Sequence, residues 1–247
     1  MNSPSAPGAL RAHQWLPESP WLAPLNDAHP DFAEGLARVG DVITAGSALS
    51  GSLPMLCAAT IAAVKRDEDL ASQYLGLAAE RGLTREEAEG AGVGVLISRG
   101  VVPHRLLVAA IGTVYGHGAQ ASEAGTEATS TNVSDALDYF KQYFGFVPDY
   151  VELLADRAPR ALEGYYLMRR AALGGTDLPA KHMELLLCAV NAAEYEARFV
   201  TIHARGARKA GATEEELVEA CLTAMPFAGV ASWLPAAQGI LESRQEP

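Results

Sequence analysis

Cysteine is scarce in this sequence, with three residues in 247, at positions 57, 188 and 221. An odd number of widely separated cysteines argues against a disulfide framework and is typical of a reducing compartment. Long apolar runs are also missing, because none approaches the roughly 18–20 residues that cross a bilayer. The N-terminal segment MNSPSAPGALRAHQWLPESPW has no uninterrupted apolar core before a cleavage site, so it does not resemble a signal peptide. We therefore expect a cytoplasmic protein without a membrane partner.

Positive charge is in deficit as well. The chain carries 19 Lys and Arg residues against 30 Asp and Glu residues, which gives a net charge of −11. A field of this sign repels phosphate backbones and anionic lipid, so we expect no nucleic-acid partner. Hydrophobic residues make up 49% of the chain, which is enough to fill a sizeable core and argues against disorder.

The alternation of Val, Ile and Thr that is typical of strands is rare, and stretches rich in Ala, Leu, Glu and Arg recur instead. Such stretches favour helices, so the sequence predicts an all-α fold. Residues 1–29, rich in Pro, Ser and Ala, are expected to form an N-terminal arm. Residues 119–133 (AQASEAGTEATSTNV) lack apolar periodicity and are typical of a linker. A further helix should be entered from Ser134.

Two segments of the chain resemble each other. Residues 82–101 (GLTREEAEGAGVGVLISRGV) and 211–230 (GATEEELVEACLTAMPFAGV) align without gaps at an offset of 129. Each has a glycine suited to ending one helix, followed by the Thr-x-x-Glu of a capping box that begins the next. Upstream, the residues around Cys57 resemble those around Cys188 at an offset of 131, which implies a small difference in the length of the connecting turn. We interpret the chain as two tandem helical repeats, at residues 30–118 and 134–247.

Titratable residues occupy inward positions in the second repeat. The helix expected over residues 194–210 carries Glu196 and His203 in its apolar stripe, whereas its Arg and Lys residues lie on the opposite face. The preceding helix, over residues 180–193, places Glu184 on its inward side. A carboxylate is costly to bury unless it is paired or protonated, and buried titratable groups cluster at functional sites. We therefore expect Glu184, Glu196 and His203 to converge in one pocket.

Each of these residues also has a purely structural interpretation. His203 alone is typical of a hydrogen-bonded core histidine, Glu196 of a charge favoured at a helix start, and Glu184 of a subunit interface. Together the three side chains would also offer oxygen and nitrogen ligands to a divalent metal ion. No short-spaced pair of histidines supports that metal site.

The order of these residues resembles a known family. A Glu, a helical turn, and a His followed eight residues later by Gly-Ala-Thr-x-Glu-Glu and then Ala-Gly-Val is similar to the core of the carboxymuconolactone decarboxylase and alkylhydroperoxidase-D-like superfamily. The resemblance covers residues 178–241 and, as a degenerate copy, residues 49–110. The redox branch of the superfamily has a Cys-x-x-Cys just before the histidine, but Glu196 and Phe199 occupy those positions here. Cys188 lies on the wrong helix to replace them, so the resemblance implies no peroxidase activity.

The decarboxylase branch, which lacks the cysteine pair and uses no cofactor, is the better match. The resemblance implies a lyase, or an isomerase, that acts by general acid–base catalysis on a small cyclic or unsaturated carboxylic or keto acid. Glu184 and His203 match the family's glutamate and histidine and are the expected acid and base. Glu196 would either tune His203 or transfer a proton itself. The resemblance also implies a homo-oligomeric helical ring of trimeric or hexameric symmetry.

The first repeat lacks the Glu–His pair. Tyr74 aligns with His203 and Asp67 with Glu196, and the alignment through the cysteines puts Leu53 opposite Glu184. We expect this repeat to be a structural partner that lines the pocket. Two alternatives to a cofactor-free enzyme stay open: a non-catalytic oligomeric protein that binds a small ligand or a partner, and a metal-dependent relative of the same fold.

Overall fold

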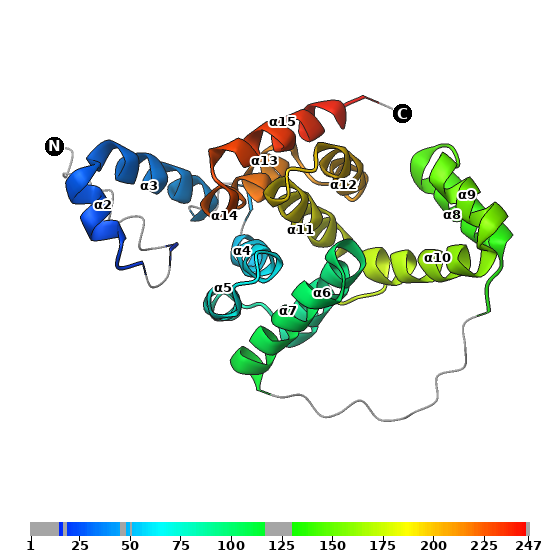
Figure 1. Ribbon diagram of the computed structural model, residues 1–247, viewed down its shortest axis with the longest axis horizontal. Coiled ribbons are helices and arrows are strands. Elements are labelled where there is room, and N and C mark those ends of the chain that lie inside the picture. The colour runs from blue at the N-terminus through cyan, green and yellow to red at the C-terminus, as the bar shows by residue number, and fades with distance from the viewer. Residues whose placement is uncertain (1–14, 17–18, 45–47, 50, 117–129, 246–247) are drawn as a thin grey trace.

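A computed structural model describes residues 15–16, 19–44, 48–49, 51–116 and 130–245. Every regular element in these ranges is a helix, as predicted (Figure 1). None of these helices is long and apolar enough to span a membrane. The helices of the first half are α2 (Leu22–Ala28), α3 (Pro30–Thr44), α4 (Leu53–Val64), α5 (Glu68–Glu80), α6 (Arg85–Arg99) and α7 (Val101–Tyr115). Those of the second half are α8 (Val133–Phe144), α9 (Asp149–Arg157), α10 (Pro159–Gly174), α11 (Ala180–Ala193), α12 (Ala197–Lys209), α13 (Glu214–Leu222), α14 (Met225–Ala228), the short 3-10 turn η1 (Val230–Ser232) and α15 (Trp233–Glu242).

Two segments predicted to be irregular differ in part from that expectation. Within the predicted arm, Leu22–Ala28 form α2, and Leu22 is fully buried. Residues 119–129 of the predicted linker lie outside the described residues. Its last residue, Val133, is already part of α8, because the Asn132 side chain accepts the Asp135 amide hydrogen and caps the start of the helix. Short polar side chains at an N-cap replace missing backbone partners, so the polar end of the linker starts a helix.

Both predicted capping boxes are present. The Thr84 hydroxyl accepts the amide hydrogen of Glu87, while the Glu87 carboxylate accepts that of Thr84. Thr213 and Glu216 repeat this arrangement at the start of α13. The glycine two positions before each threonine has a positive φ, +92° at Gly82 and +87° at Gly211. Glycine adopts this left-handed conformation without steric cost, which is why the preceding helices end there.

The offset of 131 residues, at which Cys57 aligns with Cys188, is wrong. Arg66 and Tyr195, which correspond at the offset of the capping boxes, are the two non-glycine residues with positive φ in the described part of the chain. Each lies directly before the residue whose backbone amide closes the turn. The amide of Asp67 donates to the backbone carbonyl of Ala62, and the amide of Glu196 donates to that of Asn191, both at 2.9 Å. The turn between α4 and α5 therefore has the same length as the turn between α11 and α12. A shift by two positions turns an α-helix by about 200°, so an offset of 131 would place the pairs on opposite faces. Glu184 corresponds to Met55 instead of Leu53, and Cys188 to Ala59.

The central helices α4 and α11 are the largest contributors to the main core. Nearly every residue of both is buried, and the two helices contact each other (Figure 1). Helices that are apolar on all sides pack in the interior of a domain. All three cysteines are free and buried in this core, as expected for small hydrophobic residues. The site helices α11 and α12 are thus anchored on the most buried part of the molecule.

A second, smaller core joins α8, α9 and α10. It is built from Ala136, Phe140, Val151 and Leu162. Helix α10 also contacts α6 and α11, and through it α8 and α9 are attached beside α12 (Figure 1). Likewise α3 contacts α13. Each half of the chain therefore contributes a long helix to the surface of the other half.

A buried carboxylate holds α13 to the segment that follows α3. Glu219 of α13 accepts the amide hydrogens of Ala48, at 3.1 and 3.2 Å, and of Leu49, at 2.7 Å. Glu219 is only 4% exposed, so its removal leaves backbone donors without that partner. Buried donors without an acceptor cost about 1–3 kcal/mol.

We expect Glu219→Ala to lower the free energy of unfolding by about 2 kcal/mol in a denaturant titration. Glu215→Ala, which removes an exposed carboxylate from the same helix, should change it by less than about 0.5 kcal/mol. Equal effects of the two substitutions would contradict a structural role for the Glu219 contacts.

Candidate active site

Two of the three predicted site residues meet. Glu184 of α11 and His203 of α12 are joined by a contact of 2.7 Å between Oε2 of the carboxylate and Nδ1 of the ring. The two side chains are only 6% and 9% exposed. This partnership satisfies the carboxylate that would otherwise be costly to bury. It also sets the ring orientation, because Nδ1 is engaged and Nε2 is left for a ligand.

Tyr143, at the end of α8, completes the group. Its hydroxyl donates to Oε1 of Glu184 at 3.0 Å, so the carboxylate has a different partner on each oxygen. Burial, followed by the negative charge of Glu184, raises the pKa of Tyr143. The phenol therefore keeps its proton at neutral pH and acts as a hydrogen-bond donor. Sequence reasoning missed Tyr143, because it lies far from Glu184 along the chain, in an aromatic helix with no polar residue pattern to mark it.

Gly206 provides the space for this hydrogen bond. A Cβ atom at this position would lie 2.3 Å from Oε1 of Glu184 and 2.7 Å from the Tyr143 hydroxyl oxygen. Both distances are far below van der Waals contact. Only glycine on this turn of α12 lets the Tyr143 and Glu184 side chains meet.

His203 lines a cavity of about 210 Å³ between α12 and helices α6, α10 and α11. Its apolar walls are Ile97, Phe144, Leu173, Leu187, Phe199 and Ile202. Its polar lining is Ser98, Arg99, Tyr150, Tyr165, Arg169, Asn191 and His203. A cavity that combines apolar walls with converging polar groups is the usual form of a small-molecule site.

Two arginines give this cavity a positive wall. Arg169 of α10 is 7% exposed, and its guanidinium lies 4.3 Å from the centroid of the Tyr143 ring. Arg99 of α6 donates to Oδ1 of Asn191. Nε and Nη2 of Arg169 and Nε of Arg99 are buried without a hydrogen-bond partner among the described residues. Buried donors are normally paired, so these nitrogens are polar groups for which the described residues supply no partner.

Arg99 comes from the first half of the chain, as expected for a repeat that lines the pocket. Burial lowers the pKa of its guanidinium, and the charges of Glu194 and Glu196 oppose that shift. Arginine stays protonated throughout the physiological range even so. The cavity therefore presents a fixed positive charge next to His203.

Glu196 is not brought to the Glu184–His203 pair. Helix α12 begins at Ala197, so Glu196 precedes it with φ −103° and ψ 72°. The helical projection that put Glu196 and His203 on one face does not apply to a residue outside the helix. Its side chain is exposed and is not part of the cavity lining. Within the described ranges, no group of three or more His, Cys, Asp or Glu side chains is arranged to hold a metal ion.

The corresponding region of the first repeat is filled. Tyr74, the counterpart of His203, is 1% exposed and packs against Phe227 with ring centroids 5.6 Å apart. Gly40 stands where the second repeat has Arg169, and a Cβ atom there would overlap the indole of Trp15. Large side chains thus pack closely around these positions of the first half, and the charged residues are absent from them.

The cysteines do not offer a reactive thiolate. Burial raises the pKa of all three thiols, to about 12 for Cys221. Cys188 lies in α11, where its sulfur contacts the backbone carbonyl of Val200 at 3.9 Å. Peroxide chemistry needs an accessible, ionised thiol, and none of these residues meets that condition.

Comparisons with known proteins agree with this architecture. Residues 159–242 match the model of the Carboxymuconolactone decarboxylase family, whereas no curated protein matches the chain. A candidate γ-carboxymuconolactone decarboxylase subunit from Burkholderia xenovorans LB400 is similar over 93% of this chain and 95% of its own, with 20% identity and a TM-score of 0.63. This likeness shows a shared fold.

A second Burkholderia xenovorans LB400 protein, a candidate carboxymuconolactone decarboxylase, is 26% identical over 45% of this chain and 91% of its own. Its TM-score of 0.40 is too low to support a shared fold by itself. The matched residues 159–242 run from α10 to α15 and include Glu184, His203, Arg169 and Gly206. This part of the chain is therefore similar to the carboxymuconolactone decarboxylase family.

Proposed function

We propose that the protein is a cofactor-free lyase that removes a carboxylate from a small cyclic or unsaturated carboxylic or keto acid. The observation that carries this proposal is the Glu184–His203 pair at a cavity whose lining also includes the two arginines Arg99 and Arg169. A proton-transfer group and an anion-binding group therefore face the same small space. The match of residues 159–242 to the family model supports the same reaction class.

In this proposal the arginines bind and orient the acid. Arg99 and Arg169 hold an oxygen anion of the substrate that stays on the product, or the enolate oxygen that forms in the reaction. The carboxylate that leaves is directed toward the apolar walls formed by Phe144, Leu187 and Ile202. A carboxylate in an apolar environment loses its hydration, which favours its departure as neutral carbon dioxide.

His203 then supplies the proton. As the carbon–carbon bond breaks, its electron pair passes into the conjugated or carbonyl system of the substrate. The protonated Nε2 of His203 donates its proton to the carbon that carried the carboxylate, and His203 regains a proton from solvent. Glu184 holds Nδ1 and balances the positive charge of the ring, and Tyr143 fixes Glu184. Glu196 has no step in this proposal, because its side chain lies outside the cavity.

We expect His203→Gln to reduce turnover by about 10²-fold or more, the scale of lost general acid–base catalysis, without loss of folding or oligomer size. A screen of cyclic, unsaturated and keto acids that follows carbon dioxide release or loss of ultraviolet absorbance measures this effect. Tyr74→Phe alters the counterpart of His203 in the filled repeat and should change turnover by less than about twofold. If His203→Gln keeps full activity, the catalytic assignment fails. If wild-type protein binds acids but never turns them over, the protein is a binding protein instead.

Gly206→Ala tests the arrangement of the pair without changing a titratable residue. The added Cβ atom displaces Glu184 from Tyr143 and moves His203, so turnover should fall roughly tenfold to a hundredfold, as when a catalytic group is misplaced by about 1 Å. Gly76→Ala, a helical glycine with nothing within 4 Å of the added atom, is the control. Unchanged kinetics in Gly206→Ala would show that the Tyr143–Glu184 contact does not support catalysis.

We also propose that the chain forms a homo-oligomer, with trimeric or hexameric ring symmetry. Val230, Leu234 and Leu241, from η1 and α15, are 74%, 72% and 52% exposed. Apolar side chains gathered on one surface segment mark interaction sites. Light scattering should give a mass of three or six chains, and Leu234→Glu should lower it. A wild-type mass equal to that of a single chain at micromolar concentration would contradict the assembly.

A further inference from the structure

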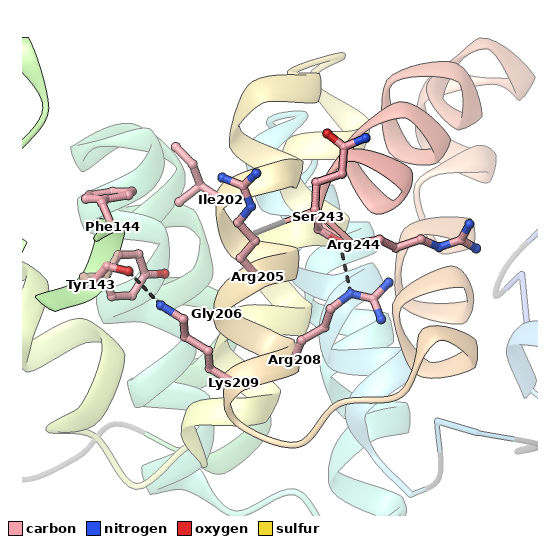
Figure 2. Close-up of a pocket in the computed structure, with 10 residues that line it drawn as sticks. Tyr143, Phe144, Ile202, Arg205, Gly206, Arg208, Lys209, Ser243 and Arg244 are labelled. Atoms are coloured by element: carbon pink, nitrogen blue, oxygen red, sulfur yellow. Dashed lines mark hydrogen bonds between the residues drawn. The ribbon is translucent and has the colours of Figure 1, made fainter. Parts of the chain in front are cut away.

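A second cavity lies on the other side of α12. It encloses about 330 Å³ between the end of α8, the outer face of α12 and the C-terminal end of α15 (Figure 2). Four cationic side chains line it: Arg205, Arg208, Lys209 and Arg244. This concentration of positive charge is unusual in a chain with a net charge of −11. The volume is in the range of small-ligand sites.

Acidic partners neutralise only part of this charge. Arg208 and Arg244 share one carboxylate, that of Glu214. Arg205 has a long contact of 3.5 Å with the Glu242 backbone carbonyl, and its Nε is buried without a hydrogen-bond partner among the described residues. The Glu242 carboxylate accepts from Thr201 and Gln238. Glu214, and Glu242 through its charge near Arg205, thus offset part of the charge of the four cationic side chains, and the cavity keeps a positive lining.

The opposite wall is apolar. Tyr143, Phe144 and Ile202 line it, and Figure 2 shows the two aromatic rings facing the side chains of α12. Phe144 and Ile202 also line the cavity of His203, so they form the partition between the two spaces. A ligand that fits both walls has an aromatic or other apolar body and an anionic group.

Tyr143 connects this second cavity to the Glu184–His203 pair. Its ring faces the cavity, its hydroxyl donates to Glu184, and its backbone carbonyl accepts from Nζ of Lys209 at 2.8 Å (Figure 2). Gly206 lines the cavity as well, and its Cα lies where Tyr143 and Glu184 meet. A ligand that pulls Lys209 away from the Tyr143 carbonyl, or that contacts and displaces the Tyr143 ring, changes the hydrogen bond between Tyr143 and Glu184.

We propose that this second cavity binds a small organic anion with an aromatic or apolar body, and that its occupancy alters the Glu184–His203 pair through Tyr143. The site is distinct from the substrate cavity, because Arg99, Arg169 and His203 line that cavity and Arg205, Arg208 and Lys209 line this one. Binding here does not depend on the function proposed above. A resulting change in turnover does rest on it, so the test uses binding and spectroscopy.

Calorimetric titration of the full chain with benzoate tests the site. Arg205→Gln removes a charge-assisted contact and should weaken binding about tenfold, and Lys209→Gln, at an exposed position, should weaken it in the same direction. Arg198→Gln, an exposed arginine of the same helix outside this cavity, should change it less than twofold. Arg99→Gln alters the substrate cavity, where the proposed function also expects an acid to bind, so it should leave intact the binding that Arg205→Gln weakens. Equal losses in Arg205→Gln and Arg198→Gln would show unspecific attraction. Loss only in Arg99→Gln would place benzoate in the substrate cavity. Either result overturns the proposal.

Two further measurements test which class of anion binds and whether Tyr143 transmits the effect of binding to His203. Inorganic phosphate should bind at least about tenfold more weakly than benzoate, because it has no apolar body for Tyr143 and Phe144. Equal affinities for phosphate and benzoate would overturn the proposed ligand class. Benzoate should shift the side-chain NMR signal of His203, assigned by its loss in His203→Gln. Tyr143→Phe, which keeps the ring but lacks the hydroxyl, should bind benzoate within twofold of wild type and lose most of that shift. An unchanged shift in Tyr143→Phe would overturn the connection through Tyr143.

Discussion

The buried carboxylate of Glu184 constrains how the helices of the second half of the chain pack together. Glu184 lies in a helix whose other residues from Met183 to Ala193 are all buried, and a carboxylate there must have a partner on each oxygen. His203 and Tyr143 are those partners, and they come from two other helices. Their approach in turn requires a residue without a side chain at Gly206. Helices α8, α11 and α12 are therefore positioned together by the needs of a single charged group.

The first half of the chain lacks that group at the positions offset by 129 residues. Met55 stands at the position of Glu184 in α4 and needs no polar partner, so Tyr74 replaces the histidine and aromatic packing replaces the hydrogen bonds. The indole of Trp15 lies against Gly40, the residue that stands at the position of Arg169 at this offset. The first half contributes Arg99 to the cavity of the second half, and close packing suits a wall that holds a cationic group in place.

Local patterns predicted the helices well because their causes are local. The capping boxes at Thr84 and Thr213 and the glycines before them act within a few residues, and the sequence alone identifies them. The Glu184–His203 pair was predictable because both residues interrupt apolar helix faces. Glu196 was misplaced because the start of α12 depends on the left-handed turn at Tyr195, which sequence periodicity does not reveal. Tyr143, Arg99 and Arg169 were missed because each reaches the site by packing between distant segments, a property that helical periodicity cannot express.

The attachment of α8 links the two cavities physically. Helices α8, α9 and α10 share a small core of their own, separate from the main core around α4 and α11. Tyr143 and Phe144, at the end of α8, therefore depend on that small core for their position, and Phe144 forms part of the wall of both cavities. A shift of α8 moves the partner of Glu184 and the aromatic wall of the basic cavity at once. Because few buried residues hold this unit, its displacement is less costly than a displacement of α11 or α12. The part of the site that is easiest to move is thus the part that the Glu184–His203 pair shares with the second cavity.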